Sequence, residues 1–341
     1  MSSPNNGLEI RSGSDADIPG VIELMRAALG EGEIPRTSEF WTWKHRQNPF
    51  GPSPMWLALD GERIVGVRLF LRWRWQHGAR SIGAVRAVDT STHPSYQGKG
   101  IFKRLTLGLV EEMTEGGIGF VFNTPNEKSR PGYLKMGWAT MGRLSLWVLP
   151  RRPHVLLRTL LGKRPADLPE DDAGSGWSAA DSQQALRAAS DTLLRNAAPN
   201  ARYHTPIDFQ YLDWRYSRCP AVSYGVISTE PRRALVICRI KRRRQLRELT
   251  ICDLFVEPTL AGVKEAAQSI RAAVRLSSPD YVVAALRQSG PETAALVASG
   301  FVPAPRLGPI VTVRELAGWA GAPDPRSPSS WHASIGDLEL F

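Results

Sequence analysis

The stretch His93-Pro94-Ser95-Tyr96-Gln97-Gly98-Lys99-Gly100-Ile101 decides the fold class of this sequence. It follows an alternating run, residues 82–91, that predicts a strand. It leads into a segment with apolar residues every four positions, which predicts a helix with one buried face: Ile101, Leu105, Leu109 and Met113. Glycines between a strand and a helix let an anion approach the helix N-terminus, where the amides and the dipole favour negative charge. The pattern alone fits a phosphate-binding turn and a turn without a ligand equally well.

The residues around this turn alternate between strand and helix patterns. Asp60-Gly61 predicts a hairpin between strands over 55–59 and 64–75, and the polar cluster 14–17 predicts the cap of a helix that runs to Leu29. Shorter patterns predict strands at 8–10 and 120–122, a short helix around Tyr133 and a closing strand at 144–149. The order is β-α-β-β-β-α-β-α-β. We therefore expect an α/β protein with a mixed sheet, of the α+β kind.

The chain is long enough for two domains, with 341 residues. Composition shifts over 151–176, a basic apolar stretch followed by acidic residues and glycine, which predicts a linker between domains 1–150 and 177–341. The second half repeats the first faintly: residues 43–49, WKHRQNP, correspond to 214–220, WRYSRCP, and Gly137-Trp138 corresponds to Gly300-Phe301. The repeat predicts two related domains.

Composition excludes several classes of protein. The charge of +10 and pI of 9.8 favour anionic ligands, which include nucleic acid and nucleotide phosphates. The basic run 241–247 has no interleaved aromatic residues, so we interpret it as a solvated hairpin and expect no nucleic-acid partner. The sequence has no membrane span, secretory signal or metal-ligand spacing, and three unpaired cysteines indicate a reducing compartment. We expect a cytoplasmic protein without a metal.

The segment 93–101 resembles the acyl-coenzyme A signature of the GNAT acetyltransferase superfamily. That signature runs Arg or Gln-x-x-Gly-x-Gly or Ala, and it is met here through Gln97 and Gly100, with Phe102 in place of the last small residue. A second element, Asn126 followed by 133–138 (YLKMGW), is similar to the family's Asn…Tyr-x-Lys-x-Gly-Phe segment. The resemblance covers residues 8–149 and implies a tandem GNAT fold.

The resemblance also implies how an acyl-CoA, most simply acetyl-CoA, would bind. The strand end Thr90-Ser91-Thr92 would pair with the pantetheine arm and Asn126 would contact the coenzyme. The pyrophosphate would lie on the loop and helix start, where the implied contacts are Gln97, Gly98, Lys99, Gly100, Ile101 and Phe102. Enzymes of this superfamily transfer the acyl group directly between bound substrates, so no covalent cysteine is expected.

Two residues are candidates for proton transfer. Tyr133 would protonate the departing thiolate, since a phenol is protonated at neutral pH; the alternative is a helix tyrosine that only packs on the sheet. Asp89 would be the base that deprotonates an amine acceptor; the alternative is a carboxylate paired with Arg86 or Lys99. His93 is a weaker candidate that fits the turn.

The second half lacks the site residues. The chain after Pro258 has no Gln-x-x-Gly pattern, and aligning Gly300-Phe301 with Gly137-Trp138 places Leu296 where Tyr133 stands. We expect a degenerate GNAT-like domain that completes the fold and shapes the acceptor cleft.

The favoured function is an N-acetyltransferase acting on a small-molecule amine. One rival is a non-catalytic CoA-binding or regulatory protein of the same fold. Another is aminoacyl transfer from tRNA, which the basic charge permits but the CoA-type loop disfavours. The identity of the acceptor, the acyl-chain preference and the oligomeric state do not follow from these patterns.

Overall fold

The computed structural model describes residues 7–30, 34, 36–154, 177, 179–190, 202–243, 246–287, 290–304, 306–317 and 321–338. They form two compact units. Unit 1 comprises Met1–Gly142 and Val311–Pro328, and unit 2 comprises Arg143–Ile310 and Ser329–Leu340. Most of the expected linker, residues 155–176, lies outside the described residues.

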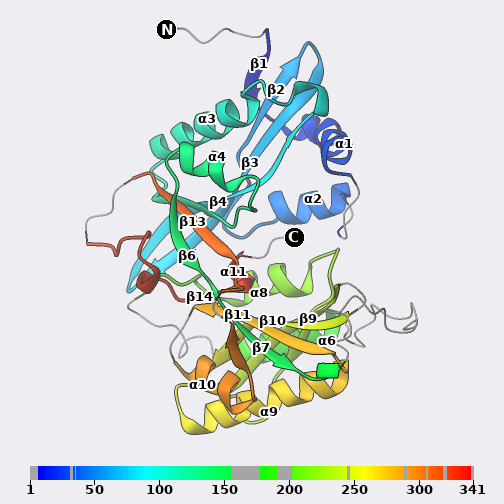
Figure 1. Ribbon diagram of the computed structural model, residues 1–341, viewed down its shortest axis with the longest axis vertical. Coiled ribbons are helices and arrows are strands. Elements are labelled where there is room, and N and C mark those ends of the chain that lie inside the picture. The colour runs from blue at the N-terminus through cyan, green and yellow to red at the C-terminus, as the bar shows by residue number, and fades with distance from the viewer. Residues whose placement is uncertain are drawn as a thin grey trace. The chain divides into compact units, whose positions relative to one another are not determined.

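Unit 1 is a seven-stranded mixed sheet with helices on both faces (Figure 1). The strand order is β1-β2-β3-β4-β5-β13-β6, in which β4 and β5 are parallel. The elements, in chain order, are β1 (Glu9–Ser12), α1 (Ile18–Leu29), α2 (Ser38–His45), β2 (Met55–Asp60), β3 (Arg63–His77), β4 (Arg80–Thr92), α3 (Ile101–Glu115), β5 (Phe120–Asn123), α4 (Arg130–Lys135), β6 (Ala139–Arg143) and β13 (Ile310–Glu315). The strands and helices predicted around the glycine turn are confirmed, and α2 is an addition that the sequence patterns did not indicate.

The helices of unit 1 bury the two faces of its sheet in separate clusters. On one face α1 packs its apolar stripe against Val67 and Leu69 of β3. On the other face α3 and α4 cover Phe70 of β3 and Val85 of β4. A Cβ on Gly66 would lie 2.5 Å from Cγ2 of Ile101, so glycine at this position permits the close approach of α3 to β3. This packing fixes the start of α3 beside the middle of the sheet.

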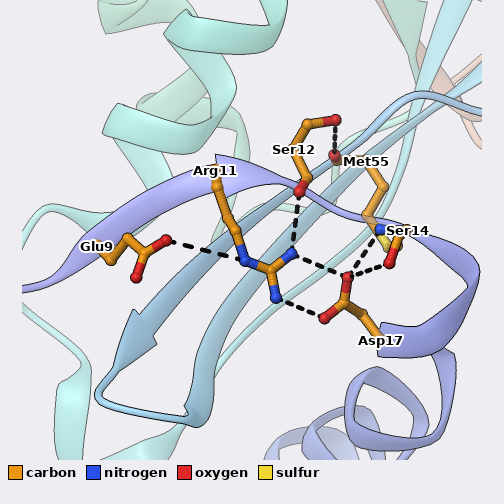
Figure 2. Close-up of polar contacts among 6 residues, drawn as sticks. All are labelled: Glu9, Arg11, Ser12, Ser14, Asp17 and Met55. Carbon is orange, nitrogen blue, oxygen red and sulfur yellow. Dashed lines mark hydrogen bonds and ion pairs between the residues drawn. The ribbon is translucent and has the colours of Figure 1, made fainter.

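The first helix of unit 1 is anchored by a cluster of charged side chains (Figure 2). Both oxygens of the Asp17 carboxylate accept from the Arg11 guanidinium, at 2.6 and 2.9 Å. The same carboxylate accepts from the Ser14 amide at 2.7 Å, as in a capping box. The hydrogen bonds from Arg11 are the largest cause that holds the pKa of Asp17 well below its usual range. The polar cluster 14–17 therefore caps a single 3-10 turn, Asp15–Asp17, that leads directly into α1, whereas Asp17 as the N-cap of α1 itself makes no side-chain cap hydrogen bond.

The closing strand expected at 144–149 does not complete the sheet of unit 1. Residues Ser145–Pro150 form β7, which lies in the sheet of unit 2, where it pairs with β11 (Tyr281–Arg287). The corresponding place in unit 1, between β5 and β6, is taken by β13 from near the C-terminus. The predicted strand is therefore confirmed, but its expected place in the first sheet is wrong, because periodicity carries no information on which sheet accepts a strand.

Unit 2 repeats the strand order of unit 1. Its order is β12-β7-β11-β10-β9-β8, which matches β6-β13-β5-β4-β3-β2 of unit 1 position by position, and β10 and β11 are parallel as are β4 and β5. Its further elements are α6 (Ala179–Ser190), α8 (Phe209–Leu212), β8 (Gly225–Ile227), β9 (Ala234–Arg243), β10 (Leu246–Val256), α9 (Leu260–Ser277), α10 (Pro291–Ala298), β12 (Val302–Ala304), β14 (Ala333–Ser334) and α11 (Ile335–Leu338).

The repeat extends to the hydrogen bonds of single residues. The Thr37 side chain caps α2 by accepting from the Phe40 amide, and Asp208 caps α8 by accepting from the Tyr211 amide at the same spacing. After α4 the Trp138 amide donates to the Tyr133 carbonyl, and after α10 the Phe301 amide donates to the Leu296 carbonyl. Leu296 is therefore the structural counterpart of Tyr133. The two halves have one fold.

Candidate active site

The glycine turn between β4 and α3 adopts the backbone conformation that an anion-binding loop needs. Gly98 and Gly100 have φ of +76° and +75°, a left-handed conformation that side chains with a Cβ rarely adopt. Gly100 is the N-cap of α3 and no side chain caps this helix. The first amides of a helix have no partner within the helix. The start of α3 therefore offers them to a ligand, on an exposed loop.

Beside this loop, β4 separates from its parallel neighbour. The pairing of β4 with β5 ends at Arg86 and Phe122, whereas the pairing of β4 with β3 continues to Thr92. The backbone of the predicted segment Thr90-Ser91-Thr92 thus faces no strand on the β5 side. The Ser91 hydroxyl in it is buried and has no hydrogen-bond partner among the described residues. A stretch of strand edge inside a sheet can pair with an extended ligand.

Asp89 sits at a β-bulge where the two strands separate. The β3–β4 register shifts between Arg68 and Leu69, and Asp89 is the extra residue on β4, with φ of +40°. A non-glycine residue held in this region carries backbone strain, which is concentrated at functional sites. The bulge therefore points to the part of the sheet where chemistry would occur.

The Asp89 carboxylate is held by two residues of α2. Its Oδ2 lies 2.5 Å from Nζ of Lys44 and 2.9 Å from Nε2 of His45. Burial opposes ionisation of Asp89, but the charge of Lys44 and the hydrogen bond from His45 outweigh it and hold its pKa well below the usual range. The sequence analysis named Arg86 or Lys99 as the alternative partners, and that prediction was wrong. The Asp89 side chain is 17% exposed, and Oδ1 has no partner among the described residues.

His45 is a buried residue with both ring nitrogens engaged. Nε2 contacts Asp89, and Nδ1 lies 2.9 Å from Oγ of Ser53. Burial, opposed by the hydrogen bond to Asp89, lowers the pKa of His45. His45 is therefore a neutral group that orients the Asp89 carboxylate. His93, by contrast, belongs to the turn, where Nδ1 accepts from the Ser95 amide.

Tyr133 lies in the core between α4 and the sheet, and its hydroxyl has a specific partner. The side chain is 4% exposed and the hydroxyl accepts a 2.9 Å hydrogen bond from Nη2 of Arg68. The ring contacts Phe102 of α3 edge-on, with centroids 5.5 Å apart. Tyr133 packs on the sheet, as the alternative in the sequence analysis had it, and also carries a polar contact suited to chemistry. It is thus placed next to the helix that begins at the glycine loop.

The other predicted contact residues surround the loop. Asn126 is exposed, and its Oδ1 accepts from the Ser129 amide, which leaves the side-chain nitrogen for another partner. The Lys99 ammonium lies 4.5 Å from the centroid of the Tyr96 ring. Gln97 is exposed, Ile101 is buried under the helix and Phe102 is half-buried.

Unit 2 has different groups at each equivalent position. The start of α9 is capped by Thr259, whose Oγ1 accepts from the Gly262 amide at 3.1 Å. Leu296 replaces Tyr133, and it is buried in the core of the unit. A helix start with its own cap and no phenol nearby lacks the features that would bind a phosphate and supply a proton. The predicted loss of the loop and the acid agrees with these contacts.

Sequence reasoning missed three residues of the site. Lys44 and His45 lie in the repeated segment 43–49 and were not singled out. Arg68 shares one face of the predicted strand 64–75 with Arg72 and Arg74, a pattern typical of an exposed face. Arg68 is in fact fully buried, whereas Arg74 is exposed, because α3 and α4 cover only one end of that face. An arginine in a strand under two covering helices was the available signal. Four tryptophans of the same half are core residues: Trp41, Trp43, Trp73 and Trp75.

Two searches of the described residues gave negative results. No group of three or more histidine, cysteine, aspartate or glutamate residues in the described part of the chain is arranged to hold a metal ion. Among the helices described, none is long and apolar enough to cross a membrane.

Comparison with known proteins agrees with this geometry. Residues 9–141 match the family model for the acetyltransferase (GNAT) domain. No curated protein matches the sequence.

Solved structures of the same fold cover most of the chain. A GCN5-related N-acetyltransferase from Kribbella flavida is 14% identical, with 97% of this chain and 81% of that chain covered and a TM-score of 0.57. One from Anabaena variabilis is 12% identical, with coverage of 91% and 73% and a TM-score of 0.57. The Saccharomyces cerevisiae N-myristoyltransferase, solved with myristoyl-CoA and inhibitors, is 9% identical, with coverage of 100% and 88% and a TM-score of 0.56. Residues 9–141 thus match the GNAT acetyltransferase domain, and the solved structures show the same fold over most of the chain.

Proposed function

We propose that unit 1 binds acetyl-CoA and transfers its acetyl group directly to the amine of a small molecule. The observation that carries this proposal is the uncapped start of α3 beside a β4 edge that β5 does not cover. The first would take the pyrophosphate on its amides and the second would take the pantetheine arm on its backbone. The start of α3 lies next to Tyr133 through the contact between the Phe102 and Tyr133 rings.

The residues of the site divide the proton transfers between them. The amine nitrogen attacks the thioester carbonyl, the carbon–sulfur bond breaks, and the phenol of Tyr133 gives its proton to the departing thiolate. A positioned general acid contributes about 10²–10⁴ to a rate. Tyr133 then regains a proton from solvent.

Asp89 serves the acceptor amine. Its Oδ2 is held by Lys44 and His45, and its unengaged Oδ1 is the atom to which an acceptor N–H would bind. Because its pKa lies well below the usual range, Asp89 stays ionised. We therefore assign it the stabilisation of the ammonium that forms on attack, with the proton passing on to water. This refines the expectation of a simple general base.

The experiment that tests the proposal is calorimetric titration of acetyl-CoA into the full-length chain. We expect one site per chain, lost in Gly100→Trp, because no other residue supports φ of +75° as glycine does and an indole would cover the amides. Gly117→Trp is the matched control, since Gly117 has φ of +71° and lies beyond the opposite end of α3.

The other outcomes separate the alternatives. Two sites per chain would show that unit 2 also binds the coenzyme. Binding without thiol release over a broad panel of amines would favour a non-catalytic CoA-binding or regulatory protein. Absence of binding at millimolar acetyl-CoA would overturn the proposal.

A further inference from the structure

Arg68 is a buried cation that the proposed function does not use. It lies on β3, its side chain is fully buried, and two of its nitrogens, Nε and Nη1, have no hydrogen-bond partner among the described residues. It forms no ion pair with a carboxylate there, and its one hydrogen bond is the one from Nη2 to the Tyr133 hydroxyl. Burying a charge without a compensating partner costs free energy. Its environment therefore points to a role other than stability.

Three aromatic rings surround the guanidinium without neutralising it. Its central carbon lies 5.0 Å from the centroid of Phe70, 5.5 Å from that of Tyr133 and 5.7 Å from that of Phe102. Ring faces attract a cation but carry no net charge. The full positive charge therefore acts on its hydrogen-bond partner, the phenol oxygen of Tyr133.

We propose that Arg68 is the positioning residue for the proton transfer from Tyr133, an inference that rests on the proposed function. Because Nη2 donates to the phenol oxygen, the phenol hydrogen points away from Arg68 and is directed to another acceptor, the thiolate. The charge of Arg68 then stabilises the phenolate that remains after the proton has left. Arg68 acts only through Tyr133 and touches neither substrate.

The test is a double-mutant cycle on turnover, with acetyl-CoA and the best amine of the panel, monitored by thiol release. We expect Arg68→Met to lower kcat by at least about tenfold, up to the effect of Tyr133→Phe itself, with an unchanged KM for acetyl-CoA. In the Tyr133→Phe background, Arg68→Met should have no further effect on kcat. Arg68→Lys should restore part of the loss, and so should millimolar guanidinium added to Arg68→Ala.

The matched control is Arg72→Met on the same strand. The Arg72 side chain donates to the Pro52 carbonyl and has no contact with Tyr133, so its kcat should equal that of the wild type. Thermal unfolding of each variant separates loss of fold from loss of function. If Arg68→Met does not fold, the Arg68→Lys variant carries the same comparison.

The outcomes distinguish the two proposals. Equal losses from Arg68→Met in both backgrounds, or a raised KM with an unchanged kcat, would overturn the role of Arg68 and leave the acetyltransferase intact. A wild-type chain that binds acetyl-CoA but never releases thiol would overturn both. Three results together would establish the role of Arg68. Arg68→Met lowers kcat without changing KM, it has no further effect in the Tyr133→Phe background, and added guanidinium restores part of the kcat of Arg68→Ala.

Discussion

The buried acid at the bulge of unit 1 and its counterpart in unit 2 have opposite electrostatics. In unit 1 Asp89 pairs with Lys44 and His45 of the preceding helix, and its pKa is lowered. In unit 2 the register of β9 and β10 shifts at Cys252, and the neighbouring Asp253 accepts from the Tyr216 hydroxyl. Burial, followed by the nearby charge of Asp337, raises the pKa of Asp253 to about 7.

The difference arises from two positions of the repeated segment. Arg215 occupies the position of Lys44, but its Nη1 donates to the Tyr224 hydroxyl. Tyr216 occupies the position of His45. A neutral phenol, with a guanidinium that is hydrogen-bonded to Tyr224, favours the charged form of a carboxylate less than an ammonium in direct contact does. One backbone plan thus supports a mostly buried carboxylate with a lowered pKa in one unit and a buried acid with a raised pKa in the other.

The largest expected effect tests whether only unit 1 carries the chemistry. Tyr133→Phe should lower kcat by about 10²–10⁴, because the phenol proton is lost while the ring packing is kept. The matched change in unit 2, Leu296→Met, should leave kcat unchanged. Steady-state thiol release measures both. Equal effects of the two changes would remove the functional distinction between the units.

The second prediction concerns the ion pair of unit 1. Lys44→Met should lower the free energy of unfolding by about 3 kcal/mol, since it leaves a mostly buried carboxylate without its cation. Urea unfolding measures the change. Arg46→Met is the control: its partner Asp15 is 74% exposed, so its loss should cost no more than about 0.5 kcal/mol. A small cost for Lys44→Met would mean that solvent or His45 alone stabilises Asp89.

The third prediction uses the opposite pKa shifts. An unfolded aspartate titrates near about 3.9, so between pH 4 and 7 folded Asp253 binds more protons than unfolded Asp253. Its contribution to stability is therefore present at low pH and lost as the pH rises to 7, with a slope of at most about 1.4 kcal/mol per pH unit. The pH dependence that Asp89 contributes has the opposite sign: its contribution to stability is present above pH 4 and lost as the pH falls below that value.

The variant Asp253→Asn isolates the contribution of Asp253 to the pH dependence of the free energy of unfolding. Relative to the wild type, its free energy of unfolding should rise between pH 5 and 7, measured in urea at each pH. Parallel curves for the two proteins would contradict the raised pKa of Asp253.

The smallest expected effect tests the equivalence of the repeated helices. Thr37→Ala and Asp208→Ala should each lower the free energy of unfolding by about 1 kcal/mol, because each removes the acceptor for one amide at a helix start. Urea unfolding of the two variants provides the comparison. A cost in only one of them would show that the two caps are not equivalent.

The sequence predicted the local features of the site well and the long-range ones poorly. The loop with Gly98 and Gly100, the helix after it and Tyr133 follow from short patterns, because turn residues and apolar periods act over a few positions. The pairing of Asp89 with Lys44 joins residues far apart in the chain. The burial of Arg68 depends on which end of β3 the helices α3 and α4 cover. Neither is encoded in a local pattern.

The placement of β7 and β13 has a consequence for synthesis of the protein. The sheet of unit 1 lacks the strand between β5 and β6 until residues 310–315 are available. A ribosome that has made the whole glycine loop and Tyr133 must add well over a hundred further residues before that gap can close. The sheet of unit 1 therefore stays incomplete while the chain between β6 and β13 is being made, and a chaperone that shields the open edges of β5 and β6 would act at this stage.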